Sequence, residues 1–158
     1  MNKITFIIKI TIILSLITGC GFKVVKKSDF INYKISDIET IGERKINYKI
    51  RNNLLLDAKE DKPKVISIIL NTTKDKTIKE KNSNNEITKY LIGVNVIVNF
   101  KEIGKDNSGS FSLSKSGEYS VNSQHSQTLN NEKKATDLII KDISDEILDE
   151  LSTMINAT

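Results

Sequence analysis

The chain is poor in the residues that build disulfides, metal sites and nucleophilic centres. Its 158 residues include one cysteine, one histidine, one proline and no tryptophan. With Cys20 as the only thiol, neither a disulfide framework nor a His/Cys metal cluster can be assembled within one chain. The fold must therefore be held by its hydrophobic core, and we predict neither a metal nor another cofactor.

A catalytic role is not expected either. His125 is the only histidine that a Ser-His-Asp triad could use, and it lies in the polar run Ser-Gln-His-Ser-Gln without the glycine pattern of a nucleophile elbow. We interpret His125 as an exposed loop residue. Four acids near the C-terminus follow the solvated face of a helical pattern: Asp145, Glu146, Asp149 and Glu150. The sequence therefore predicts a binding protein that is not an enzyme.

Charge is modest and of mixed sign. The formal net charge is +4, with 24 basic and 20 acidic residues, and no basic stripe follows one predicted face. A nucleic-acid-binding domain usually carries a strongly basic patch, so we expect no nucleic-acid partner. The hydrophobic fraction of 38% is enough for one globular core in a chain of this length.

The N-terminal segment has the features of a lipoprotein signal peptide. Lys3 and Lys9 supply positive charge around an apolar stretch that is shorter than the roughly 20 residues of a membrane-spanning helix. The following Ile17-Thr18-Gly19-Cys20 resembles a lipobox, in which the sulfur of Cys20 receives diacylglycerol and its new amino group is acylated. We predict a signal peptide at 1–19 and a lipidated tether at 20–30; an ordinary signal peptide with an unmodified Cys20 is the alternative.

Hydrophobic periodicity predicts one α+β domain at 31–158. Alternating residues such as those from Tyr90 to Phe100 indicate strands with one buried face, and apolar residues at four-residue spacing, as from Ala135 to Leu151, indicate amphipathic helices. A lysine-rich hairpin tip is expected between Lys74 and Asn85, and a bulge at Gly117. The predicted elements are a strand at 31–41, a helix between Gly42 and Pro63, strands at 64–81, 89–101 and 111–121, and a helix from about residue 131.

This order, β-α-β-β-β-α, predicts a two-layer sandwich. Its sheet has four mostly antiparallel strands, and both helices cover one face. Together with the lipobox and the Cys20-Gly21-Phe22 start, the arrangement resembles the LptE family of lipopolysaccharide-assembly lipoproteins. The passage from Tyr119 into the terminal helix is similar to the end of that family's domain.

The LptE resemblance implies a function at the outer membrane. It implies a lipid-anchored protein on the periplasmic face that plugs and helps fold an LptD-like β-barrel and helps deliver lipopolysaccharide to the outer leaflet. Charge complementarity with the phosphates of lipid A selects five lysines as candidate contacts: Lys74, Lys76, Lys79, Lys81 and Lys115. The alternative is another periplasm-facing adaptor, such as a transport-auxiliary subunit or a regulator of a cell-wall enzyme.

Overall fold

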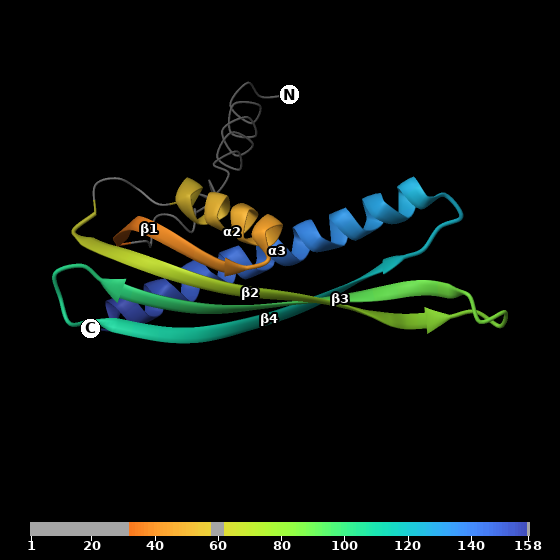
Figure 1. Ribbon diagram of the computed structural model, residues 1–158. Helices are drawn as coiled ribbons and strands as arrows, with labels where there is room; N and C mark the ends of the chain where they lie inside the picture. Colours follow the sequence, from red (N-terminus) through yellow and green to blue (C-terminus); the bar gives the residue numbers. More distant parts are fainter. Residues whose placement is uncertain (1–31, 58–61, 158) are drawn as a thin grey trace, which may run out of the picture.

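The computed structural model describes residues 32–57 and 62–157. The predicted signal peptide, the tether and Cys20 lie outside the described residues. Four strands and two helices follow the predicted order (Figure 1). They are β1 (Tyr33–Gly42), α2 (Arg44–Asp57), β2 (Lys64–Lys81), β3 (Ile87–Glu102), β4 (Ser108–Ser120) and α3 (His125–Asn156).

The sheet has the order β1-β2-β3-β4. β1 runs parallel to β2, because α2 connects them as a crossover, and the other neighbours are antiparallel. Both helices cover the same face of the sheet, with α3 running along its length (Figure 1). The predicted fold class, a two-layer α+β sandwich with a mostly antiparallel sheet, is therefore confirmed.

Side-chain alternation explains the core. In β3 the side chains of every second residue from Ile92 to Phe100 are buried, and those between them face the open side of the sheet. The apolar stripe of α3 from Ile139 to Ile155 packs against this face, and Ile46, Ile50 and Leu54 of α2 complete the layer.

The ends of several elements differ from the prediction. β2 continues through Lys74 and Lys79 to Lys81, with register shifts after Ile78, so the turn between β2 and β3 contains only residues 82–86. β4 pairs with β3 without a register shift, so the bulge predicted at Gly117 is wrong. Gly117 instead allows close helix packing, since a Cβ there would lie 3.1 Å from Cδ1 of Ile139.

Two further differences concern the starts of the helices. Gly42, which marks the start of the first predicted helix, is the last residue of β1 and has a φ of 92°. Its lack of a side chain is required because a Cβ would lie 2.0 Å from the carbonyl oxygen of Thr72. His125 is exposed, as predicted, but it is the first residue of α3 and not part of a loop. No helix within the described ranges is long and apolar enough to cross a bilayer.

Candidate functional site: a basic-rimmed groove between the helices

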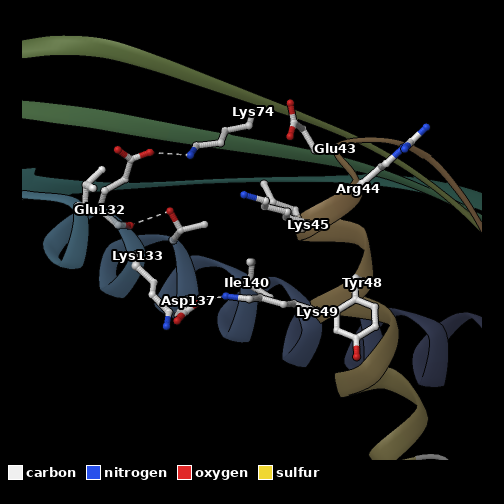
Figure 2. A pocket seen from close by; sticks show the side chains of 13 residues that line it. Glu43, Arg44, Lys45, Tyr48, Lys49, Lys74, Glu132, Lys133, Asp137 and Ile140 are labelled. Carbon is white, nitrogen blue, oxygen red and sulfur yellow. Dashed lines mark hydrogen bonds and ion pairs between the residues drawn. The ribbon is translucent and has the colours of Figure 1, made fainter. Parts of the chain in front are cut away.

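A groove of about 540 Å³ lies between the N-terminal turns of α2 and the N-terminal half of α3 (Figure 2). Ile46 and Ile140, both buried, form part of its lining. Tyr48 and Leu129 stand at its walls with 66% and 52% of their surface exposed, so apolar groups remain available to a ligand. The groove is therefore apolar inside, although it opens on a charged rim.

The start of α2 is fixed to the sheet by hydrogen bonds. The buried amide of Asn47 donates from Nδ2 to the carbonyl of Ile41, at 2.9 Å, and its Oδ1 accepts from the hydroxyl of Thr72, also at 2.9 Å. The backbone N–H of Glu43 donates to the carbonyl of Thr72. These contacts hold the first turn of α2, and therefore one wall of the groove, in place.

Five cations line the groove, and three of them have no partner among the residues that the structure describes. Within the described ranges, Arg44, Lys45 and Lys133 have no ion-pair or hydrogen-bond partner for their side chains, and Lys45 extends from α2 toward α3 (Figure 2). The first-turn N–H groups of α2 also lack intrahelical acceptors, and no acid lies in that turn. The positive end of the α2 dipole therefore lies beside Arg44 and Lys45, with Glu43 immediately before them.

The remaining cations are held in ion pairs with α3. Lys49 pairs with Asp137 across the groove (Figure 2). Lys74 pairs with Glu132 at 2.9 Å, and Lys76 pairs with the other oxygen of Glu132 at 3.3 Å. These pairs join β2 and α2 to α3, so that the two walls of the groove are linked by charge.

Glu132 is the centre of the polar cluster beside the groove. It accepts hydrogen bonds from Lys74 and, at 3.0 Å, from the hydroxyl of Tyr119. The hydrogen bond from Lys74, followed by that from Tyr119, outweighs partial burial and holds the pKa of Glu132 at about 2. Lys76 also lies over the ring of Tyr90, 4.2 Å from its centroid, and Tyr90 stacks on Tyr119. Glu132 is therefore a fixed anion that positions cations.

An anion with an apolar portion fits this arrangement best. A phosphate can interact with the N-terminal turn of α2 and with Lys45 and Lys133 at the rim. The apolar portion can contact Ile46, Leu129 and Ile140 below them. The groove thus combines the two kinds of contact that a lipid phosphate requires.

The five lysines predicted to contact lipopolysaccharide do not form one site, although Lys74 and Lys76 share Glu132. Lys74 lines the groove and Lys76 lies beyond it over the two tyrosines, both on β2 and not in a flexible tip. Lys79 pairs with Glu118, and Lys81 donates to Asn85 at the turn. Lys115 pairs with Glu146 of α3 at 2.7 Å. Only Lys74 of the five therefore belongs to the groove.

The sequence interpretation missed the lysines that α2 and α3 contribute. Lys45 and Lys49 are four residues apart and flank the apolar stripe of a predicted helix, so their common face could have been recognised. Their proximity to Lys133 could not, because it depends on how the two helices pack. Within the described residues, no cluster of three or more His, Cys, Asp or Glu side chains has metal-ligand geometry.

The fold defined by these elements is shared with solved structures of lipoproteins. The crystal structure of rare lipoprotein B from Shewanella oneidensis superposes with a TM-score of 0.55 and 15% identity, covering 77% of this chain and 98% of that one. The solution structure of the uncharacterised lipoprotein B from Nitrosomonas europaea gives 0.51 and 14%, covering 87% and 94%. No protein-family model matches the sequence, and no curated protein sequence matches it.

Proposed function

We propose that this protein is an LptE-type outer-membrane lipoprotein that binds lipopolysaccharide without catalysing a reaction. In this role its lipid anchor at Cys20 holds the domain at the periplasmic face, next to an LptD-like β-barrel that it plugs and helps fold. The observation that supports lipid binding is the groove between α2 and α3, where cations without a partner among the described residues border apolar side chains.

Charge and exposure support the groove as the lipid-binding site. Lys45 and Lys133 lie on opposite walls and have no carboxylate partner within the described residues, so a phosphate would not displace an existing ion pair. Lys79 and Lys115, in contrast, would have to leave Glu118 and Glu146. We therefore assign the headgroup to Lys45 and Lys133, and not to Lys74, which would have to leave Glu132.

The open face of the sheet supports a role inside a barrel. Ser, Asn and Thr side chains predominate on this face, and the lumen of a β-barrel is polar. A plug with such a surface can rest against the lumen without burying unpaired charges.

Binding of purified lipopolysaccharide to the domain tests the groove. We expect the double substitution Lys45→Gln/Lys133→Gln to weaken binding on the order of tenfold or more, because two charge-assisted contacts are lost. Lys134→Gln is the matched control, since this exposed lysine neighbours Lys133 on α3 but does not line the groove. Equal losses in the control, or no loss in the double variant, would reject the groove.

A pull-down of the full lipidated chain from membranes tests the partner. Recovery of an LptD-like barrel is the expected result. Recovery of a cell-wall synthase or an inner-membrane transporter, with no barrel protein, would instead identify the chain as another kind of adaptor and overturn the proposed partner.

A further inference from the structure

β4 lies at one edge of the sheet. Most of its backbone N–H and C=O groups that point away from β3 belong to serines. The N–H of Glu102 donates to the carbonyl of Asn107, at 2.8 Å, and the N–H of Val121 donates to Thr88, at 2.9 Å. Between these two bonded pairs the register of β3 and β4 is continuous. Antiparallel bonding alternates along a strand, so the odd-numbered residues of β4 bond to β3 and the even-numbered residues turn outward. Six of those seven are serines: Ser108, Ser110, Ser112, Ser114, Ser116 and Ser120.

These outward groups are available for pairing. Among the residues that the structure describes, only the carbonyl of Ser120 has a partner, Nδ2 of Asn131 at 3.1 Å. The serine side chains from 108 to 116 are exposed. The middle of β4 therefore presents a row of N–H and C=O groups that water alone satisfies.

The other edge of the sheet is built differently. β1 has a register shift between Ile35 and Asp37, and it carries the charged residues Lys34, Asp37 and Glu39. Bulges and charges of this kind prevent a further strand from adding to an edge. β4 has neither a bulge nor a proline, and its one charge between 108 and 117 is Lys115, which pairs with Glu146 beneath the sheet. The two edges thus differ in the features that control strand addition.

An acidic stripe of α3 runs beside the open edge. Asp142, Glu146 and Glu150 follow one another at four-residue spacing, and the ion pair between Glu146 and Lys115 places this stripe next to β4. Asp142 and Glu150 are exposed. A strand added to β4 would therefore direct every second side chain toward carboxylates.

We infer that β4 accepts an extended segment of a partner protein as a fifth strand, and that this segment carries Lys or Arg at alternate positions. Backbone bonding to the serine row supplies the affinity, and the acidic stripe selects the basic face of the segment. A second copy of this chain fits less well, because antiparallel pairing of two β4 strands places both α3 helices on one face. Their acidic stripes would then approach each other.

A fluorescent nine-residue peptide of alternating threonine and lysine, with capped ends, serves as the probe. We expect it to bind the domain and to slow amide hydrogen exchange at Ser110, Ser112, Ser114 and Ser116, the residues that turn outward. The matching threonine–glutamate peptide should bind at least about tenfold more weakly, because it meets the acidic stripe. Absence of protection at these serines would overturn the inference.

Two sets of variants separate the contribution of the β4 backbone to peptide binding from that of the α3 carboxylates. Ser112→Pro/Ser114→Pro removes two outward N–H groups but no bond to β3, so binding should be lost, whereas Ser112→Thr/Ser114→Thr keeps it. Asp142→Asn/Glu150→Gln leaves β4 intact and should remove the preference for lysine over glutamate, which keeps the test decisive even if the proline variant unfolds. If the carboxylate variant still prefers the lysine peptide to the glutamate peptide, the basic partner segment is rejected. It is also rejected if sedimentation shows a dimer of this chain that the proline variant dissociates.

Discussion

At the residue scale, Glu132 shows how one carboxylate organises the groove. Its two oxygens receive Lys74, Lys76 and the hydroxyl of Tyr119, and the hydrogen bond from Lys74 makes the largest contribution to a pKa of about 2. The ordinary value is 4.5. Since the folded state lowers the pKa, the carboxylate stabilises the fold above about pH 4.5, and this contribution is lost as the pH falls toward 2.

We therefore expect Glu132→Gln to lower the free energy of unfolding by about 2 kcal/mol near neutral pH, because charge-assisted hydrogen bonds are lost. The difference from the unsubstituted protein should shrink as the pH falls from about 4.5 toward 2. Urea denaturation across this range measures it. Glu118→Gln is the control, since its pair with Lys79 is exposed to solvent and should contribute less to stability. A difference that does not change with pH would contradict the assigned pKa.

At the element scale, alternation was enough to predict the strands, whereas their ends depended on contacts distant in sequence. The inward residues of β2 continue from Leu70 through Thr72 to Lys74, so period-two alternation does extend into the lysine-rich segment. The sequence nevertheless predicts a tip from Lys74 onward, because the segment ends in the turn-prone run Asn-Ser-Asn-Asn at 82–85. Glu132 and Tyr90 compensate the inward Lys74 and Lys76, and the sequence alone gives no sign of these partners.

Much of the candidate site also depends on contacts between residues that are distant in sequence. The sequence identified Lys74 but grouped it with Lys79 and Lys81, which lie farther along β2. The groove joins Lys74 to Lys45 and Lys133, which are remote from it in sequence. Periodicity places a residue on one face of its own element, but it does not determine which faces of α2 and α3 meet. The lysines that line the groove could therefore be identified as one group only from the packed structure.

The junction between β1 and α2 gives a test at this scale. We expect Gly42→Ala to destabilise the domain by about 3 kcal/mol, because a Cβ would lie 2.0 Å from the carbonyl oxygen of Thr72 and φ is positive. Gly104→Ala has a similar φ of 83° but meets no atom within 4 Å, so a loss of about 1 kcal/mol is expected. Thermal melts of both variants measure the difference. Equal losses would show that the close approach at Gly42 is unimportant.

At the scale of the whole molecule, we expect the core and the proposed anchor to act separately. Among the described residues, the buried cluster extends from Tyr33 to Ile155. Tyr33 illustrates how closely the start of the domain is joined to its end. Its hydroxyl lies 3.4 Å from the carbonyl of Leu148, and burial raises its pKa to about 12. A change at Cys20 is therefore expected to alter membrane attachment and leave the fold intact.

Cys20→Ser in the full chain tests this separation. We expect the variant to lose incorporation of labelled palmitate and to move from the membrane to the soluble fraction. Each buried methylene of an acyl chain contributes about 0.8 kcal/mol to membrane binding, and the variant lacks these chains. Its melting temperature should equal that of the domain with Cys20 unchanged, since every residue of the described core, from Tyr33 to Ile155, is unchanged. Loss of membrane attachment with an unchanged melt would assign Cys20 to anchoring alone. Continued palmitate incorporation by Cys20→Ser would show that the chain is not a lipoprotein modified at this residue, and the proposed membrane role would then require a different anchor.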